Sequence, residues 1–332
     1  MGRTGLRVSE VCLGTMTFGM QADTATAFEI MNRAIDGGVN FFDTADVYPV
    51  PVADTTRGDT EVIIGKWLST PGRRDSIVLA TKCRARMGSH SWSEGLNRKH
   101  ILRAVEDSLR RLNTDYIDLY QAHSPDAETP IEETLAAFDS LVKSGKVRYI
   151  GCSNFAAYQL SKALWTSDVQ KLARFDCVQP RYNLLFRHIE AELLPLCKEE
   201  GVGVIAYNPL AGGFLTGKHQ KQVEAAPDTR FGVMKGRGSL YHDRYWQDAQ
   251  FDAVEALKAA FVGAEKTLAQ AAVAWVLQQP GITSAIVGAS RPEQLDETLK
   301  ACTVTLTPEE LAACDDAWFS LPRHRDPGIA YR

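Results

Sequence analysis

Four side chains that could together deliver a proton to a carbonyl stand near the ends of apolar, β-branched runs. Asp43 ends the run NFFD and is followed by Tyr48, while Lys82 ends SIVLATK and His123 ends YIDLYQAH. A buried lysine needs a partner for its charge, and a carboxylate such as that of Asp43 provides one. An ammonium group stabilises a phenolate and so lowers the pKa of a tyrosine, which is about 10 in water. Together these residues indicate general acid catalysis with Tyr48 as the proton donor.

Each of these residues, taken singly, also has a structural explanation. An aspartate at the end of a strand often caps a helix, a lysine often extends along apolar surface to solvent, and a histidine among apolar residues is often a hydrogen-bonded part of the core. The functional interpretation therefore depends on the elements that would bring the four side chains together.

Short β-branched runs alternate with segments of helical periodicity, which is typical of repeated βα units. The first seven runs are spaced from 26 residues (153 to 179) to 41 residues (82 to 123), and a βαβ unit needs about 30 or more. The expected strands end near Thr15, Asp43, Lys82, His123, Ser153, Gln179, Tyr207 and Gly288. Eight strands favour a (β/α)8 TIM barrel, one domain over residues 1–332, rather than a doubly wound sheet, and the chemistry of such a barrel lies at the carboxyl ends of its strands.

Four of the expected helices carry the pattern of a capping box, in which a Ser or Thr is followed three residues later by Glu or Gln. The pairs are Thr129 with Glu132, Thr267 with Gln270, Ser290 with Glu293, and Thr307 with Glu310. The start of a helix presents free N–H groups and the positive end of the helix dipole, so a helix opening at Ser290 is expected to favour an anion.

A long insertion is expected after the seventh strand, because 81 residues separate the strand ends at 207 and 288. Residues 210–250 are rich in glycine, basic and aromatic residues without periodicity, which indicates a clasp for a cofactor and substrate, with a tolerated surface insertion as the alternative. We expect the tail, residues 322–332, to lie over the active face as a lid. The aromatic residues expected at the pocket mouth are Phe18, Trp92, Tyr241 and Trp246.

An ordered set of motifs along nearly the whole chain resembles the aldo-keto reductase family. The motifs are LGTMTFG (13–19), NFFDTADVY (40–48), TK (81–82), YIDLYQAH (116–123), GKVRYIGCSNF (145–155), QPRYN (179–183), AYNPLAGGFLTGK (206–218) and VGASRPEQLDE (287–297). The resemblance implies a (β/α)8 barrel that uses NADP(H), without a metal, to interconvert aldehydes or ketones and alcohols, as an alcohol dehydrogenase or carbonyl reductase (EC 1.1.1). The catalytic tetrad of the family falls on Asp43, Tyr48, Lys82 and His123.

The same motifs imply the cofactor contacts. Those that would hold the nicotinamide carboxamide are Ser153, Asn154 and Gln179, and Tyr207 would stack on the ring. Those that would pass the pyrophosphate are Asn208, Leu210 and Gly212, with Lys218 and Arg230 as a basic clasp. Those at the adenosine end are Gly288, Ser290, Gln294 and Glu297. Many relatives have Arg in place of Gln294 and Asn in place of Thr298, so the preference for NADPH over NADH stays open, although the clasp cations favour NADP(H).

Composition excludes several other classes of protein. The chain has 332 residues, of which 45% are hydrophobic and 23% charged, and a net charge of −4 with scattered basic residues, which makes nucleic acid an unexpected partner. The longest apolar stretch, residues 271–277, is too short to span a membrane, and we expect a cytoplasmic protein. Seven cysteines without a CxxC pair fit a reducing compartment and no zinc site.

Three alternatives compete with the reductase. Regulatory β subunits of potassium channels are similar to this family and bind NADPH without needing to turn over, although only about ten residues precede the first expected strand and we expect no gating segment. A glycosidase would need two acids, such as Asp43 and Asp118, but Asp118 lies inside a strand. The segment GVGVIA (201–206) matches GxGxxA, the fingerprint of a Rossmann dinucleotide-binding site. That fingerprint follows a strand and opens a helix, whereas this segment precedes a strand. The substrate is expected to be a small carbonyl or alcohol, aryl or alicyclic if the pocket walls are apolar.

Overall fold

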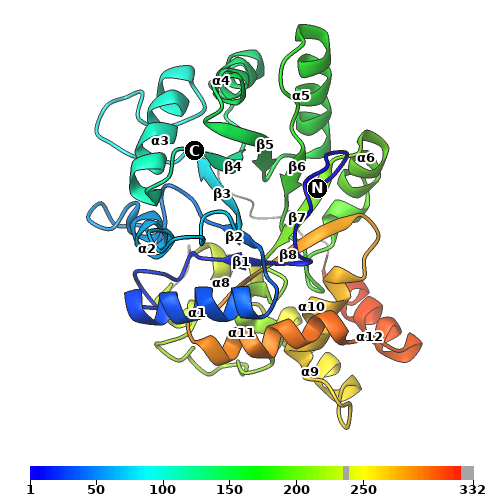
Figure 1. Ribbon diagram of the computed structural model, residues 1–332. Coiled ribbons are helices and arrows are strands. Elements are labelled where there is room, and N and C mark those ends of the chain that lie inside the picture. Colours follow the sequence, from blue (N-terminus) through cyan, green and yellow to red (C-terminus); the bar gives the residue numbers. More distant parts are fainter. Residues whose placement is uncertain (235–238, 323–332) are drawn as a thin grey trace.

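Eight parallel strands close into a barrel in the computed structural model, which describes residues 1–234 and 239–322 (Figure 1). The strands are β1 (Val11–Gly14), β2 (Phe41–Asp43), β3 (Val78–Cys83), β4 (Ile117–Ala122), β5 (Val147–Ser153), β6 (Cys177–Gln179), β7 (Gly203–Tyr207) and β8 (Ile282–Gly288). Each strand pairs with the next, and β8 pairs with β1. The predicted (β/α)8 barrel is confirmed, and every predicted strand end lies within one residue of the observed one.

Helices surround the barrel as a ring (Figure 1). Those that follow strands one to six are α1 (Thr24–Asp36), α2 (Asp59–Leu68), α3 (Arg98–Leu112), α4 (Ile131–Lys143), α5 (Ala157–Gln170) and α6 (Leu193–Glu200). The ring is completed by α10 (Leu268–Leu277) before β8 and α11 (Pro292–Leu299) after it, and α12 (Pro308–Phe319) packs against α9 (Asp248–Ala260). No helix within the described ranges is long and apolar enough to cross a membrane.

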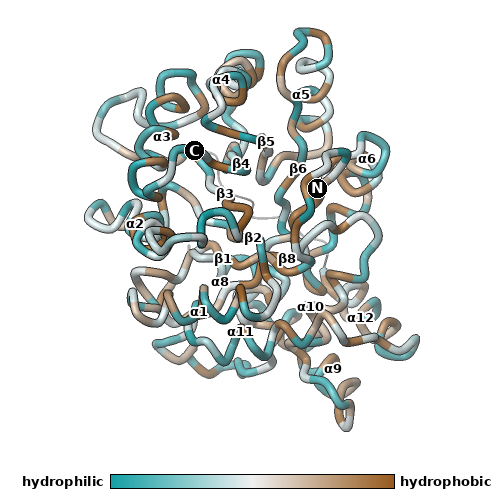
Figure 2. Tube along the Cα trace, viewed as in Figure 1, coloured by the Kyte–Doolittle hydropathy of each residue, from teal (hydrophilic) through white to brown (hydrophobic). Residues whose placement is uncertain are grey.

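Alternation along the strands creates two apolar cores. On β3, Val78 and Ala80 belong to the cluster inside the barrel, whereas Leu79 and Cys83 pack between the barrel and its helices. Met1 is buried in the inner cluster, so the first residues help to close the amino-terminal end of the barrel. Figure 2 shows the same division, with brown, hydrophobic residues along the central strands and teal, hydrophilic residues on the outer turns of the ring.

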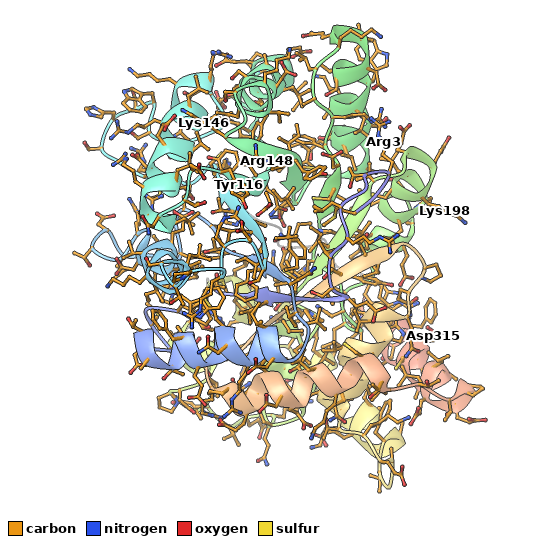
Figure 3. All side chains as sticks on the ribbon, in the orientation of Figure 1. Arg3, Tyr116, Lys146, Arg148, Lys198 and Asp315 are labelled. Atoms are coloured by element: carbon orange, nitrogen blue, oxygen red, sulfur yellow. The ribbon has the colours of Figure 1, made fainter. Side chains whose placement is uncertain are left out.

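The beginnings of β4 and β5 carry a stacked cationic group on the face of the barrel opposite the predicted site. The guanidinium carbons of Arg74 and Arg148 lie 3.8 Å and 4.6 Å from the ring centre of Tyr116. Figure 3 shows Tyr116, Lys146 and Arg148 near one another there. Arg74 also forms an ion pair of 2.7 Å with Asp118. Such contacts fix neighbouring strands and leave the opposite end of the barrel for chemistry.

Two of the four predicted capping boxes are confirmed, at Thr267 before α10 and at Thr307 before α12. The box at Thr129 is wrong: α4 begins after Pro130, because the Thr129 hydroxyl donates instead to Asp126 at 2.7 Å. The helix expected to open at Ser290 begins two residues later as α11, and the residue that caps it is Gln294 rather than Glu293.

The insertion after β7 is more ordered than its sequence suggests. Residues 210–250 contain the 3₁₀ segment η2 (Ala211–Thr216), the short helices α7 (Arg230–Val233) and α8 (Leu240–Tyr245), and the start of α9. Phe214, Phe231, Tyr245 and Phe251 pack together there as a buried aromatic cluster. The predicted lid after Pro322 lies outside the described residues, and the assignment of 1–332 as one domain with an inserted clasp stays a prediction.

Candidate active site

Four predicted side chains meet at the carboxyl ends of β2, β3 and β4. The Nζ of Lys82 lies 2.5 Å from Oδ1 of Asp43 and 2.7 Å from the carbonyl oxygen of Thr44. The same ammonium lies 5.2 Å from the ring centre of Tyr48, and the rings of Tyr48 and His123 are 5.8 Å apart, edge to face. The barrel therefore assembles a phenol, an ion pair and an imidazole in one place.

The second oxygen of Asp43 is fixed by two amides. Oδ2 accepts hydrogen bonds from the side chains of Gln179 at 2.9 Å and Gln121 at 3.1 Å, and Gln179 also donates to Gln121. The sequence analysis missed Gln121, although it lies two residues before His123 and therefore on the same side of β4. In register it is the partner of Lys82 on the neighbouring strand.

Burial and charge act differently on the three titratable groups. Burial alone would lower the pKa of Lys82, but Asp43 and then Tyr48 raise it above its usual range, so the ammonium stays charged. Burial raises the pKa of Tyr48, and Lys82 opposes this rise without reversing it. The expected lowering of the phenol pKa is therefore wrong for this structure. Burial, followed by Lys82 and Arg84, lowers the pKa of His123 to about 3, so its imidazole is neutral at pH 7.

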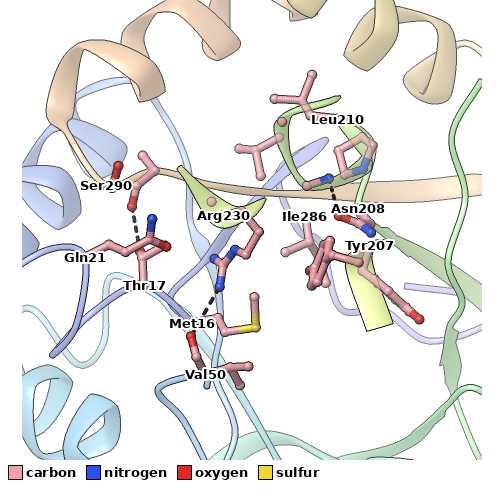
Figure 4. Close-up of a pocket in the computed structure, with 18 of the residues that line it drawn as sticks. Met16, Thr17, Gln21, Val50, Tyr207, Asn208, Leu210, Arg230, Ile286 and Ser290 are labelled. Atoms are coloured by element: carbon pink, nitrogen blue, oxygen red, sulfur yellow. Dashed lines mark hydrogen bonds between the residues drawn. The ribbon is translucent and has the colours of Figure 1, made fainter. Parts of the chain in front are cut away.

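A cavity of about 470 Å³ extends from these groups to the start of α11 (Figure 4). Every predicted catalytic or cofactor residue contributes to its wall except Lys82, which is fully buried and paired with Asp43. These residues are Asp43, Tyr48, His123, Ser153, Asn154, Gln179, Tyr207, Asn208, Leu210, Gly212, Lys218, Arg230, Gly288, Ser290, Gln294 and Glu297. The geometry brings them to one cavity, and their roles toward a cofactor stay predictions.

Other wall residues were not predicted. They include Met16, Thr17, Gln21, Val50, Asp228, Met234, Leu240, Arg244, Ile286 and Arg291. Met16 and Thr17 directly follow β1, and Arg291 adjoins Ser290, so their positions after strand ends were a usable signal. Residues of the insertion such as Asp228 and Leu240 carried no such signal, because the path of a long loop does not follow from its sequence.

A chain of hydrogen bonds fixes the polar wall beside the phenol. Asn154 donates to the carbonyl oxygen of His123 and to the Ser153 hydroxyl, both at 2.9 Å, and its own Oδ1 accepts from the Tyr207 hydroxyl at 2.9 Å. The Ser153 hydroxyl donates to the carbonyl oxygen of Gln179. Asn154 adopts a left-handed backbone conformation with φ of 62°. The hydrogen-bonded amide turns this loop residue toward the cavity.

The loop after β7 follows the cavity wall in a run of left-handed residues. Asn208, Ala211, Gly212 and Gly213 have φ values of 67°, 51°, 71° and 93°. The Asn208 side chain holds the turn by accepting from the backbone N–H of Gly212 at 2.8 Å. The positive φ of Gly213 is one that residues with a side chain rarely adopt, and the Lys218 ammonium lies beside this glycine. Turns of this kind and nearby cations are suited to an anion.

The far end of the cavity combines a capped helix start with two cations. The amide oxygen of Gln294 accepts from the backbone N–H groups of Ser290 and Arg291, at 2.9 Å and 3.3 Å. The Arg291 guanidinium lies 3.7 Å from the carboxylate of Asp228 in the insertion. Burial and then Arg291 lower the pKa of Lys218, and Asp228 opposes them, so the charges of these three residues act on one another.

Arg230 does not join this end of the cavity. Its guanidinium donates to the carbonyl oxygen of Val50 at 3.4 Å and lies 5.8 Å from the ring centre of Tyr241. Figure 4 shows Arg230 reaching toward Val50, in the region between Ser290 and Tyr207. Its position is therefore closer to the middle of the cavity than to the adenosine end.

Of the four aromatic residues expected at the mouth, only Tyr241 lines the cavity. Phe18 is fully buried in the core, and Trp246 packs against Phe231 with ring centres 5.0 Å apart. Trp92 stacks on His90 in the loop after β3. These expectations were wrong because aromatic residues in long loops also supply the packing that orders those loops.

The features behind the competing interpretations lie elsewhere. Asp118 faces away from the cavity, where it accepts from the backbone of Leu79 and pairs with Arg74, so it forms no acid pair with Asp43. GVGVIA begins directly after α6 and its last four residues lie in β7, so it leads from a helix into a strand and does not follow a strand. All seven cysteines are free, and in the described ranges no three His, Cys, Asp or Glu side chains form a group that could hold a metal.

The chain is similar to several known proteins. It is 41% identical over 322 residues to an uncharacterized oxidoreductase, YrpG, of Bacillus subtilis, which covers 95% of this chain and 94% of the relative. It is 37% identical to a probable voltage-gated potassium channel subunit beta of Arabidopsis thaliana, covering 97% of both chains. It is 34% identical to the aldo-keto reductase YhdN of Bacillus subtilis, covering 92% of this chain and 89% of the relative. The model of the aldo/keto reductase family matches residues 10–318, and the chain belongs to that family.

Proposed function

We propose that this oxidoreductase interconverts aldehydes or ketones and alcohols with NADP(H), and that Tyr48 is its general acid and base. The observation that carries the proposal is the contact of a buried Asp43–Lys82 ion pair with the ring of Tyr48, beside a neutral His123. A buried ion pair is often no more stabilising than two apolar side chains of similar size. The presence of this ion pair is therefore better explained by catalysis than by stability.

The four side chains divide the work in carbonyl reduction. Tyr48, with its raised pKa, keeps its proton at neutral pH and donates it to the carbonyl oxygen. Lys82 stabilises the phenolate that remains, and Asp43 keeps the ammonium in place. His123, a neutral imidazole, donates a hydrogen bond that orients the carbonyl oxygen. A bound nicotinamide cofactor would supply the hydride.

The wall of the cavity fits a dinucleotide cofactor in three respects. Tyr207 offers a ring beside polar side chains, the left-handed turn at 208–213 suits a pyrophosphate, and cations lie at the far end. Lys218 and Arg291 would bind the 2′-phosphate that distinguishes NADP(H) from NAD(H). Their two charges support NADP(H) even though Gln294 offers no charge to that phosphate. In that arrangement Arg291 takes the part that the sequence analysis gave to Arg230.

The wall of the cavity also carries apolar side chains. They include Met16, Val47, Val50, Met234 and Leu240, together with the ring of Tyr241. Such walls favour aryl or alicyclic carbonyls over charged metabolites, because a charged group would lose its hydration without gaining a partner. A cytoplasmic location stays part of the proposal.

The proposal is tested by following NADPH and NADH oxidation by the purified protein with aliphatic, aryl and alicyclic carbonyls. We expect turnover with NADPH, fastest on aryl or alicyclic compounds. Absence of cofactor binding by fluorescence or calorimetry at near-millimolar NADPH would overturn the cofactor assignment. Binding without turnover on any compound would overturn the catalytic assignment alone.

That last outcome would favour the second candidate, a regulatory β subunit that binds NADPH. The relative named as a probable potassium channel subunit beta, at 37% identity over nearly the full chain, is the observation that supports it. A regulatory role does not require the proton donor, so replacement of Tyr48 would leave it intact, whereas an enzyme would lose its turnover.

A further inference from the structure

Three polar side chains from alternate strands lie together inside the barrel, next to the cavity. Asp43 on β2, Gln121 on β4 and Gln179 on β6 are buried, and none of them is more than 4% exposed. Alternate strands fill one layer of a barrel interior together, but such layers ordinarily consist of branched apolar residues. Buried amides and carboxylates cost free energy unless they are hydrogen-bonded. The polarity of this group therefore points to a role in the site rather than in the core.

Gln121 contacts two residues of the predicted site without lining the cavity itself. Its side-chain nitrogen donates to Oδ2 of Asp43 at 3.1 Å, and its oxygen accepts from the side-chain nitrogen of Gln179 at 3.2 Å. Gln179 uses the same nitrogen to donate to Oδ2 of Asp43 at 2.9 Å. Asp43 and Gln179 both line the cavity, whereas Gln121 does not. Gln121 can therefore act on a bound molecule only through these two side chains.

These contacts set the orientation of the Gln179 amide. Asp43 and Gln121 both accept from its nitrogen, and the oxygen of a planar amide lies on the other side of the group. That oxygen is left as an acceptor, and the carboxamide of a bound nicotinamide has N–H donors that suit it. An amide turned the other way would place its oxygen against the Asp43 carboxylate, where two acceptors repel each other.

The strand between β4 and β6 leaves room for the contact of the two glutamines (Figure 1). On that strand, β5, Gly151 is the register partner of Gln121 on one side and of Cys177 on the other. A Cβ added to Gly151 would lie 2.6 Å from Sγ of Cys177 and 3.4 Å from Cγ of Gln121. A side chain at this position would crowd the place that the Gln121 side chain occupies, so the glycine keeps it open.

Given the proposed function, on which this inference rests, we propose that Gln121 is a positioning residue that joins the cofactor contact to the proton donor. It holds Gln179 for the nicotinamide carboxamide and Asp43 for Lys82. Lys82 bonds Oδ1 of Asp43 while the two amides bond Oδ2, so the carboxylate is fixed at both oxygens. One hydrogen-bonded unit thus runs from Gln179 to the ammonium beside the ring of Tyr48.

Gln121→Met keeps the length of the side chain and removes both hydrogen bonds. We expect the Kd of NADPH, measured by fluorescence or calorimetry, to rise about three- to tenfold, the usual weight of one hydrogen bond. The Kd of adenosine 2′,5′-bisphosphate, which has no nicotinamide, stays unchanged. The kcat for carbonyl reduction falls about tenfold, because Asp43 loses a donor. The matched control is Gln279→Met, which removes an amide just after α10, away from the cavity, and changes none of these values.

Two further variants test the path of the effect. In a Gln179→Met background, Gln121→Met should weaken NADPH binding no further, because the residue through which it acts is gone. Gln121→Asn keeps a polar amide, one methylene shorter, and should behave as Gln121→Met does. Unchanged circular dichroism confirms that the variants are folded.

Three outcomes would overturn the positioning role while the proposed function stands. They are wild-type affinity for NADPH in Gln121→Met, an equal loss of affinity for adenosine 2′,5′-bisphosphate, and a full additional loss in the Gln179→Met background. A wild type that binds no NADPH would instead overturn the proposed function together with this role of Gln121.

Discussion

The amide oxygen of Gln294 lies 2.9 Å from the backbone nitrogen of Ser290 and 3.1 Å from its hydroxyl oxygen. The donors at the start of α11 are thus bonded within the chain, and the side chain that replaces an arginine of many relatives acts as a cap. A cofactor phosphate at this end of the cavity would therefore have to be bound by positively charged side chains. The two that line the cavity there are Lys218 and Arg291.

We therefore expect Arg291→Ala to narrow the preference for NADPH over NADH by about tenfold, mainly through a higher KM for NADPH. A hydrogen bond to a charged group contributes roughly 1.5–3 kcal/mol, and a tenfold change corresponds to about 1.4 kcal/mol. Steady-state kinetics with both cofactors measures the ratio. Arg103→Ala, on the exposed side of α3, removes the same charge away from the cavity and is the matched control. If Arg230→Ala narrowed the ratio and Arg291→Ala did not, the assignment of the cations would be reversed.

The strand ends were predictable because short β-branched runs between helical segments mark buried parallel strands. The tetrad followed from them, since consecutive parallel strands present their carboxyl ends together. Gln121 was missed because a polar residue inside a strand gives no signal until its register against Lys82 is known. The direction of the Tyr48 pKa was wrong because burial, the largest influence on it, is not visible in a sequence. The cap at Thr129 failed because α4 begins one residue later and the Thr129 hydroxyl donates to Asp126, and the cap at Ser290 failed because the amide oxygen of Gln294 accepts from the N–H groups there.

Tyr48→Phe is expected to lower kcat for carbonyl reduction by about 10²–10⁴-fold, the usual contribution of a general acid. Affinity for NADPH should change less than about twofold, because the ring remains and only the transferable proton is lost. The control is Tyr158→Phe, which removes the hydroxyl of a tyrosine that is exposed on α5, away from the cavity. Retention of more than about a tenth of kcat by Tyr48→Phe would mean that another group is the donor.

His123 is expected to couple stability to acid pH. Its folded pKa of about 3 lies below the ordinary value of 6.5, so between these values the unfolded chain binds the proton more readily than the folded chain. Stability from this residue is complete above pH 6.5 and is lost as the pH falls toward 3, by up to about 1.4 kcal/mol per pH unit. Denaturant unfolding at pH 7 and pH 5 measures the loss. His123→Asn should lose less stability than the wild type over this range, whereas His90→Asn, in an exposed loop, should match the wild type.

Asp46 behaves in the opposite sense. Both of its carboxylate oxygens are buried, and no side chain among the described residues donates a hydrogen bond to them. Burial, and then the nearby carboxylate of Glu61, raise its pKa well above the usual range. Because the folded pKa is raised, the protonated acid is stable at pH 4, and stability falls as the pH rises above the unfolded pKa of about 3.9. An amide of the same shape carries no such charge at any pH.

Asp46→Asn is therefore expected to gain stability relative to the wild type as the pH rises. The difference in Tm between variant and wild type should be small at pH 4 and several degrees in favour of the variant at pH 7, since 1 kcal/mol shifts Tm by about 2–4 °C in chains somewhat shorter than this one. Thermal unfolding at both pH values measures the difference. Asp36→Asn, at the exposed end of α1, should show none of this dependence. A variant equally destabilised at pH 4 and pH 7 would mean that the ionised carboxylate of Asp46 is stabilised by its surroundings, against the direction given by its burial.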